Sequence, residues 1–443
     1  MHVGALLVFD LPEGASPDYL REQYEAAVSE QNFRAPFNQK LDFPLSRLGV
    51  PRWIDDEEFD PGYHLRHAAL PAPGRYRELF SLISRLHGTL LDRSRPLWEC
   101  YLIEGLQGTQ FAMYVKAHHG MVDGVAAMRL VQKSLSEDPD ARDVRFAWSA
   151  ERRQEARPQE APAIDEKGGL GKVVDVISEQ LRTLPAVTRA VARSALSLRT
   201  PQDARMALPF EAPHSVFNTP VTGARRYVAQ SYSLDRIHGI GKSYGATVND
   251  VVLAMCASAL RRYMQELGGG VPDKPLIAMV PVSIRPTDAE SLGNALTGVL
   301  VNLGTHVADP VKRFEVIKTS MADAKTLVKE MTYAEIMFYT ALVAGPVMTP
   351  SLVGLGAAIP SVNVVISNVP GPNAPLYWNG AKLCGMYPLS ILFHGMALNI
   401  TLASNIDHLD FGIVACRRSL PSVQRIIEFL EEGLVELEQG AKR

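Results

Sequence analysis

The stretch of sequence that decides this fold is His118-His119-Gly120-Met121-Val122-Asp123-Gly124. It follows residues 111–117, where apolar side chains alternate with period two, as in a half-buried strand. Residues 125–135 come after it and carry apolar side chains at helical spacing. The sequence therefore predicts that the two histidines lie in a strand-to-helix loop, where a rigid scaffold can hold a reactive side chain at a cleft.

Histidine in such a loop suits proton transfer, because its unperturbed pKa lies near neutral pH. To accept a proton from a hydroxyl, the ring must be neutral, with one nitrogen free and the other hydrogen-bonded. Adjacent residues cannot both point at one substrate atom, so we expect one of His118 and His119 to face the cleft and the other the scaffold. Asp123 can brace the loop or cap the following helix. On these residues alone, a purely structural role for the loop stays open.

Other chemistries find less support in the sequence. A metal site would need ligands that the loop does not supply, and the remaining histidines are scattered. No Gly-x-Ser-x-Gly elbow is present for a serine triad. The cysteines are far apart and form no C-x-x-C pair, so we expect neither a disulfide framework nor a thiolate zinc site; they are Cys100, Cys256, Cys384 and Cys416.

The bulk composition is that of an ordinary globular chain. The 443 residues suit two domains or one large bilobal unit, with 47% hydrophobic and 21% charged residues and a net charge of −3. This near-neutral balance argues against nucleic acid as the main partner. Residues 1–11 form a short apolar segment without a basic region before it, so no signal peptide is predicted, and a reducing cytoplasm fits.

One long stretch, Ile336–Ala381, contains no charged residue. Six prolines interrupt it, so no piece approaches the roughly 20 residues that a membrane-spanning helix needs. Two interpretations remain: a buried core, or the wall of a long apolar pocket.

The pattern of elements divides the chain into residues 1–145, a connector at 146–224 and residues 225–443. Both outer segments read as strands covered by helices, which suggests two similar lobes with a cleft between them. Thr247 is expected to cap a buried helix, with Asp250 in its first turn. The remaining expected strands are 1–9, 96–106, 276–284, 297–303, 362–367, 396–404 and 409–416, and the remaining helices are 18–31, 76–90 and 421–437.

Within the connector, residues 173–198 carry apolar stripes at helical period. Arg182, Arg189 and Arg193 share a different face. That face is either a solvated surface or part of an amphipathic element that rests on anionic lipid.

His118-His119-x-x-x-Asp123-Gly124 resembles the HHxxxDG signature of the CoA-dependent acyltransferase superfamily, which condensation domains of peptide synthetases share. Further stretches in the same order resemble the bacterial wax ester synthase/acyl-CoA:diacylglycerol acyltransferase family. They are Pro96-Leu97-Trp98, Asn249-Asp250, residues 280–285, Gly293-Asn294 and residues 367–372. The resemblance covers nearly the whole chain. It implies an α/β fold of two similar lobes of mixed sheet covered by helices, chloramphenicol-acetyltransferase-like, with the active site at the lobe interface.

The resemblance implies an acyl-CoA-dependent O-acyltransferase that makes wax esters and triacylglycerol by direct transfer, with His119 as general base. His118, Asp123 and Asp250 would support the loop. Arg285 would support it by pairing with Asp123, and Gly124 would allow close backbone approach.

Oxyanion stabilisation is assigned to Asn249, beside Asp250, because its amide could project from a helix N-terminus into the cleft; a capping or core role is the alternative. The candidates for the substrate pocket are Pro96, Trp98, Ser367 and Asn368, with Trp98 favoured as a core anchor.

The expected partners are acyl-CoA as co-substrate, a long-chain alcohol or diacylglycerol, and a membrane or lipid-inclusion surface on the cytoplasmic side; no cofactor or metal is expected. A condensation-type enzyme that uses carrier-protein thioesters and a non-catalytic lipid-binding relative are the alternatives. Family members usually carry a short segment before the Met1-His2-Val3-Gly4 seen here, so either Met1 is internal to a longer protein or the first helix is absent.

Overall fold

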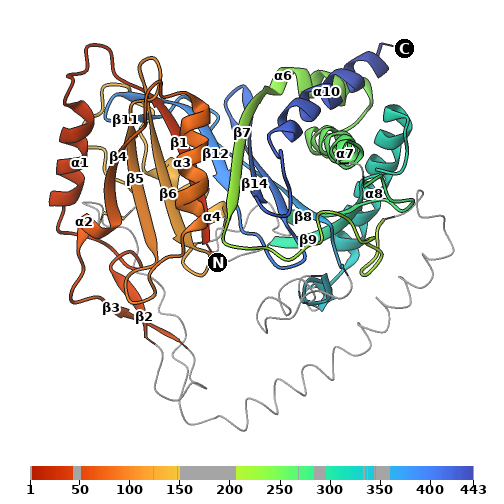
Figure 1. Cartoon of the computed structure of the whole chain (residues 1–443), viewed down its shortest axis with the longest axis horizontal. Helices are drawn as coiled ribbons and strands as arrows, with labels where there is room; N and C mark the ends of the chain where they lie inside the picture. Colours follow the sequence, from red (N-terminus) through yellow and green to blue (C-terminus); the bar gives the residue numbers. More distant parts are fainter. Residues whose placement is uncertain are drawn as a thin grey trace, which may run out of the picture.

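A computed structural model describes residues 2–42, 51–122, 124–146, 148–149, 206–267, 269–283, 296–332, 335–336, 338–343, 345 and 360–442. Within them, two six-stranded mixed sheets stand side by side, and helices cover them (Figure 1). The predicted fold class, two lobes of mixed sheet with helices, is confirmed.

The first sheet has the strand order β11-β12-β1-β6-β5-β4. Its central strand β6 is antiparallel to β1 on one edge and to β5 on the other. The bounds are β1 (His2–Asp10), β4 (Leu65–Ala69), β5 (Trp98–Glu104), β6 (Gln110–His118), β11 (Tyr377–Trp378) and β12 (Ala381–Leu389). A separate two-stranded sheet pairs β2 (Gln39–Asp42) with β3 (Arg52–Asp55).

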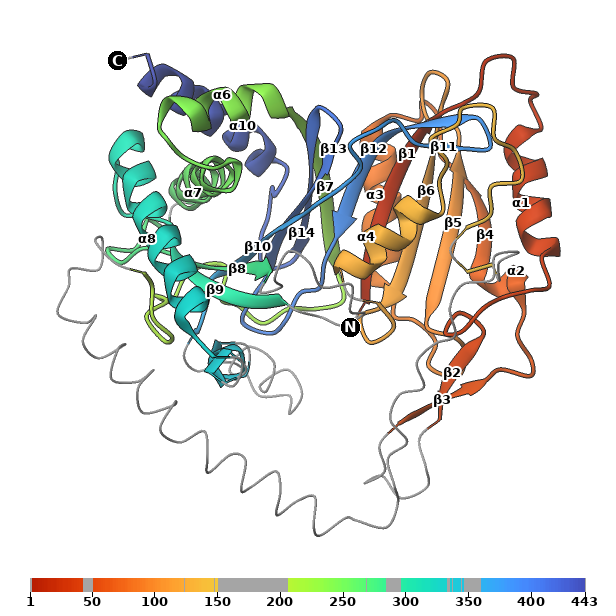
Figure 2. The same ribbon diagram turned by 180° about the vertical axis from the view of Figure 1, so that it is seen from behind.

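The two faces of the first sheet pack against different helices, because successive side chains of a strand point to opposite faces. Helix α3 (Tyr76–Gly88) packs with Ala112 and Tyr114 of β6, in a core that continues into the second lobe. Helices α1 (Tyr19–Ser29) and α4 (Gly124–Lys133) belong to a separate core on the other face (Figure 2). The short helix α2 (Pro61–His64) precedes β4.

The second sheet has the order β7-β14-β13-β10-β8-β9. Helix α7 (Val248–Glu266) is largely buried and packs along α10 (Arg425–Gly440). The other elements of this lobe are β7 (Arg225–Ser233), β8 (Ile277–Ser283), β9 (Leu296–Asn302), β10 (Val364–Val369), β13 (Leu398–Asn405), β14 (His408–Cys416), α6 (Leu234–Ser243) and α8 (Pro310–Glu330).

Two strands from the segment after residue 225 lie in the sheet that is built mainly by residues 1–145. Strands β11 and β12 follow β10 in sequence, yet they join the first sheet, where β12 is antiparallel to β1. The second half of the chain therefore completes the first lobe. The physical reason is pairing: without β12, the buried strand β1 would present an unpaired edge.

The predicted β1, α1, α3, β5, β6, α4, α7, β8, β9, β10, β13, β14 and α10 are all confirmed within a few residues. The structure adds β2, β3, β4, β7, β11, β12, α2, α6 and α8, which the sequence analysis did not identify. Residues 173–198, with their arginine face, lie outside the described residues. Among the helices that the structure describes, none has the length and apolar character needed to cross a bilayer.

A buried ion pair anchors α3 to the sheet next to the histidine loop. The fully buried Lys116 ammonium lies 3.0 Å from a Glu99 carboxylate oxygen and donates to the carbonyls of Leu86 and Thr89, each at 3.2 Å. Tyr101 donates its hydroxyl to the same carboxylate at 3.0 Å. Burial lowers the pKa of Lys116, and the nearby Glu99 opposes that shift. The pair therefore depends on both partners being present.

We predict that Lys116→Met destabilises the protein by about 3 kcal/mol, because it leaves the buried Glu99 carboxylate without its main counter-charge. The double variant Lys116→Met/Glu99→Gln should recover part of that loss, since it removes the uncompensated charge. Urea unfolding followed by circular dichroism measures both. A double variant less stable than the single variant would contradict this account.

Candidate active site

The histidine loop is held by backbone hydrogen bonds at the end of β6. The amide of His118 donates to the carbonyl of Leu97 at 2.8 Å, and that of Met121 donates to the carbonyl of His118 at 2.8 Å. The amide of Gly120 donates to Nδ1 of His118 at 3.1 Å. Nδ1 of His118 is thus an acceptor within its own loop, which leaves Nε2 to carry the proton of the neutral ring.

The two histidines differ in exposure, and the prediction that one faces the cleft and the other the scaffold stays a prediction. His118 is half-buried, whereas the neighbouring His119 is exposed. Both line a cavity of about 650 Å³, which we name the catalytic cavity. Burial lowers the pKa of His118, and the positive charge of Arg93 acts in the same direction. His118 therefore stays neutral at physiological pH.

The catalytic cavity lies between the lobes, and both lobes supply apolar side chains to its wall. In the first lobe, Val115 and Ala117 of β6 face Met128 and Val131 of α4. In the second lobe, the lining is supplied by Met279, Val343, Val365, Phe393 and Met396. Part of the charge-free stretch lines this wall, through Thr340, Val343, Val365, Ser367 and Val369. Other described residues of the stretch, such as Ile336, Val364 and Ile366, are buried in the core, so each of the two predicted interpretations holds for part of it.

A few polar side chains interrupt this apolar lining in the second lobe. Asn399 and Thr401 of β13 are both buried, and Ser367 lies on the neighbouring β10, in register with Thr401. The Thr401 hydroxyl donates to Oδ1 of Asn399 at 2.8 Å. This bond orients the Asn399 amide so that its NH₂ group is available to the cavity.

A second pair of histidines, His2 and His87, links the strand next to the histidine loop to α3 and to the second lobe. His2 is paired with His118 across β1 and β6, and its Nε2 donates to the carbonyl of His87 at 2.6 Å. His87 in turn receives the Tyr114 hydroxyl at Nδ1 (2.8 Å) and donates from Nε2 to the carbonyl of Ser390 (3.4 Å). Burial lowers the pKa of His2 to about 4 and that of His87 well below its ordinary value. Both rings are therefore neutral members of a bridge from α3 to a cavity-lining residue of the second lobe.

Several predicted site residues lie away from the catalytic cavity. Asn249 is not among the described residues that line it. Its neighbour Asp250 is buried and, as predicted, closes a capping box with Thr247, accepting from the Thr247 amide at 2.9 Å. Pro96, Trp98 and Asn368 are also absent from the described lining.

Trp98 is fully buried and donates from Nε1 to the carbonyl of Phe37 at 2.7 Å, which places it in the core. Gly124 is the first residue of α4. Asp123 and Arg285 lie outside the described residues.

The sequence analysis missed Asn399, Thr401, His2 and His87. A signal for the first two was present, since Leu398-Asn399-Ile400-Thr401 alternates polar and apolar side chains inside a predicted strand. The histidines gave no such signal, because their contacts join residues 85 and more than 300 positions apart.

Comparison with solved structures first defines the class. The first condensation domain of the CDA synthetase matches with a TM-score of 0.53 at 17% identity, covering 99% of this chain and 90% of that chain. That likeness shows the fold alone: two lobes of mixed sheet covered by helices. The wax ester synthase/diacylglycerol acyltransferase from Marinobacter aquaeolei VT8 matches more closely, with a TM-score of 0.79 and 42% identity over 100% of this chain and 95% of that chain.

The family follows from the sequence comparisons. The wax ester synthase/diacylglycerol acyltransferase catalytic domain matches residues 1–252, and the C-terminal domain of the same family matches residues 292–438. A probable diacylglycerol O-acyltransferase of Mycobacterium tuberculosis H37Rv is 46% identical over 99% of this chain and 95% of its own length. The O-acyltransferase WSD of Acinetobacter baylyi is 43% identical over 98% and 92%. The chain belongs to the wax ester synthase/diacylglycerol acyltransferase family and is an O-acyltransferase.

The buried histidines predict acid sensitivity. Their folded pKa values lie below the ordinary 6.5, so the unfolded chain binds more protons as the pH falls below 6.5. The free energy of unfolding is therefore unaffected by these histidines above pH 6.5 and falls as the pH drops towards 4. For His2 alone the fall amounts to about 3 kcal/mol. Urea unfolding between pH 7.5 and 4.5 measures this loss. His2→Gln should flatten the dependence; an identical slope in the variant would rule His2 out as a cause.

Proposed function

We propose that this enzyme transfers the acyl group of a long-chain acyl-CoA to the hydroxyl of a long-chain alcohol or diacylglycerol, with His119 as general base. One observation carries the proposal: the exposed His119 lines a cavity between the lobes, and both lobes supply apolar side chains to its wall. A largely apolar wall beside a histidine suits a reaction that brings two hydrocarbon chains to one imidazole. Each buried methylene contributes about 0.8 kcal/mol, so long chains can bind through apolar contact alone.

The reaction needs no acyl-enzyme intermediate. The neutral ring of His119 accepts the proton of the alcohol while the alcohol oxygen attacks the thioester carbonyl carbon. The resulting tetrahedral oxyanion collapses, the C–S bond breaks, and the proton passes from His119 to the departing sulfur. The products are the ester and free CoA, and the imidazole returns to its starting state.

His118 acts as a support for this step. Its Nδ1 is occupied by the Gly120 amide, so it is a poor candidate for the proton acceptor, and its ring fixes the loop that carries His119. The paired residue His2 adds a second restraint from β1. The assigned support from Asp123 and Arg285 stays a prediction.

Asn399 is the best-supported donor to the tetrahedral oxyanion. Its amide is buried, is oriented by Thr401 and lines the cavity, as an oxyanion donor must be positioned before the reaction. Ser367 on the adjacent strand offers a second hydroxyl donor. We propose these residues in place of Asn249, whose helix start does not line the cavity.

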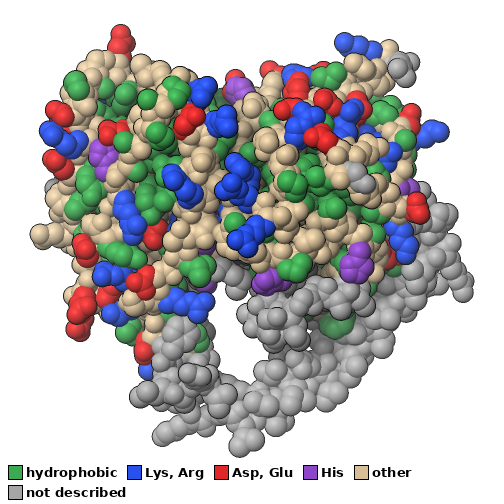
Figure 3. Space-filling view, viewed as in Figure 1, with side chains coloured by type: hydrophobic (Ala, Val, Ile, Leu, Met, Phe, Trp, Pro, Cys, Tyr) green, Lys and Arg blue, Asp and Glu red, His purple; other side chains and the backbone are tan. Residues whose placement is uncertain are grey.

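Cations near the histidine loop suit the phosphates of CoA. Arg93 lowers the pKa of His118 and Arg225 lowers those of His2 and His87, which puts both positive charges near this end of the site. Figure 3 shows Lys and Arg side chains gathered between the lobes on the face that carries α3 and β7. We propose that acyl-CoA enters from this face. Association with a membrane or lipid inclusion on the cytoplasmic side stays a prediction.

We expect His119→Ala to lower kcat for CoA release from palmitoyl-CoA and hexadecanol by about 10²–10⁴-fold, the contribution typical of a general base. His408→Ala is the matched control, because the His408 side chain is exposed at the start of β14 and its ring forms a hydrogen bond with the neighbouring Asp407. Release of CoA is followed with a thiol reagent. Wild-type turnover by folded His119→Ala would refute the assignment.

Asn399→Asp should lower kcat by about 10²–10³-fold, because it replaces the amide donor with a carboxylate that repels the oxyanion. The KM for palmitoyl-CoA should change little, since the lost interaction forms only in the transition state. Asn32→Asp, at an exposed position, controls for the added charge. An Asn399→Asp variant that raises KM and keeps kcat would instead assign Asn399 to substrate binding.

The alternatives are tested by changing the acyl donor. A condensation-type enzyme would require acyl groups on a phosphopantetheinylated carrier protein and would not consume free acyl-CoA. A non-catalytic lipid-binding protein would consume neither donor with any alcohol or diacylglycerol. Ester formation from free acyl-CoA excludes both.

A further inference from the structure

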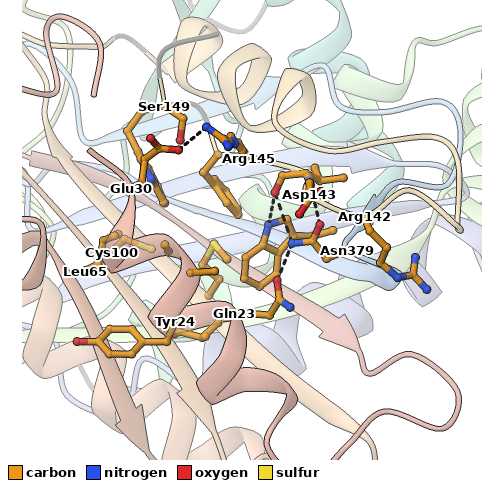
Figure 4. A pocket seen from close by; sticks show the side chains of 18 of the residues that line it. Gln23, Tyr24, Glu30, Leu65, Cys100, Arg142, Asp143, Arg145, Ser149 and Asn379 are labelled. Atoms are coloured by element: carbon orange, nitrogen blue, oxygen red, sulfur yellow. Dashed lines mark hydrogen bonds and ion pairs between the residues drawn. The ribbon is translucent and has the colours of Figure 1, made fainter. Parts of the chain in front are cut away.

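A second cavity, of about 270 Å³, lies under α1 in the first lobe and takes no part in the chemistry described above (Figure 4). We name it the α1 cavity. Its floor is apolar and is formed by Leu65, Cys100, Leu102 and Met113. Ala26 and Ala27 of α1 line the helix side.

Several polar groups around the α1 cavity are paired with one another or with the backbone. Arg145 forms an ion pair with Glu30 at 2.6 Å, and Asn379 donates to Gln23 at 2.6 Å (Figure 4). Trp378 donates from its indole nitrogen to the carbonyl of Val144 at 3.1 Å. The apolar floor is the part of this cavity that suits a hydrocarbon chain.

The α1 cavity and the catalytic cavity share two lining residues among those described, Phe146 and Trp148. Both are buried, their rings stack at 4.7 Å, and Trp148 also stacks on Trp98 at 5.1 Å. These two rings form an aromatic partition between the cavities.

The same face of strand β6 lines the α1 cavity on one side of the partition and the catalytic cavity on the other. Met113, Val115 and Ala117 occupy alternate positions on β6 and therefore point the same way. Met113 lines the α1 cavity, whereas Val115 and Ala117 line the catalytic cavity and lead to His119. Removing the partition would create a single apolar channel along β6.

The distances match the length of a lipid tail. A strand rises about 3.3 Å per residue, so Val115 lies about 13 Å and Met113 about 20 Å from His119 along the chain. A tail of ordinary membrane lipid spans half of a hydrocarbon core about 30 Å thick, or about 15 Å. A tail of that length, with its reacting end at His119, would reach the partition and stop there.

We infer that Phe146 and Trp148 set the upper length of one substrate tail, and that the α1 cavity is the space a longer tail enters when the partition is opened. The inference rests on the proposed function and adds its specificity determinant. The tail is a straight hydrocarbon chain; it belongs either to the acyl group or to the alcohol, and the experiment separates the two.

The test is Phe146→Ala, assayed by CoA release. One series varies the acyl-CoA from palmitoyl to stearoyl, arachidoyl and behenoyl with hexadecanol fixed; the other varies the alcohol over the same lengths with palmitoyl-CoA fixed. For each longer chain, the measured quantity is its kcat/KM divided by that of the sixteen-carbon chain. In one of the two series, this ratio should be higher in Phe146→Ala than in the wild-type enzyme, by about fourfold for each additional methylene that the opened channel accommodates. The series that responds identifies which tail uses the channel.

A filling variant supplies the matched control. Ala27→Phe places a ring in the α1 cavity from α1 and should leave turnover of palmitoyl-CoA with hexadecanol unchanged. Combined with Phe146→Ala, it should abolish the gain for longer chains. A gain that survives the filling would overturn the role of the α1 cavity.

Unchanged length ratios in both series, with normal turnover of the sixteen-carbon substrates, would overturn the inference and leave the proposed function intact. Absence of turnover in the wild-type enzyme would instead overturn the proposed function. Thermal unfolding checks that Phe146→Ala is folded; if it is not, Phe146→Leu, which shortens the partition and keeps apolar contact, decides in the same assay.

Discussion

The geometry of the site depends on the register of β6. This strand is bonded along both edges, to β1 and to β5, so it has no freedom to slide. One of its faces is fixed to α3 by Tyr114 and the buried Lys116, and the other supplies Val115 and Ala117 to the catalytic cavity. A slip of one residue would exchange these faces, burying the cavity lining and pushing a lysine into an apolar channel.

Strand β12 comes from the second half of the chain but lies in the first sheet, so residues from both halves of the chain line the cavity on this side. Leu389 and Ser390 at its end line the cavity, and Ser390 accepts a hydrogen bond from His87. The crossing is tight: a Cβ atom on Gly412 of β14 would lie 1.8 Å from the carbonyl oxygen of Pro388. Such close packing holds the second lobe against the strand that carries the histidines, so the lobes have little freedom to separate at this point.

Much of this fold could be predicted from the spacing of apolar residues alone, because most strands and helices bury one face. Strand β12 could not, since Gly385 and Pro388 break the pattern expected of a strand. The histidine loop was placed correctly because a strand and a helix flank it. The start of α7 was also placed correctly at Thr247, yet Asn249 does not line the cavity. Which way a helix start faces is decided by packing against α10, far along the chain, and no local pattern contains that information.

The apolar character of the catalytic cavity bears on which reaction occurs there. Water is itself a nucleophile, and a base that activates an alcohol would equally activate water against the thioester. Hydrocarbon tails that fill the cavity displace water from its lining. The polar side chains that the second lobe supplies, such as Thr401 and Asn399, already satisfy one another in part. Exclusion of water also strengthens each remaining electrostatic contact to the oxyanion. Tail binding and ester formation are therefore two consequences of the same apolar surface: a tail that seals the cavity both positions its own reacting end and removes the competing nucleophile.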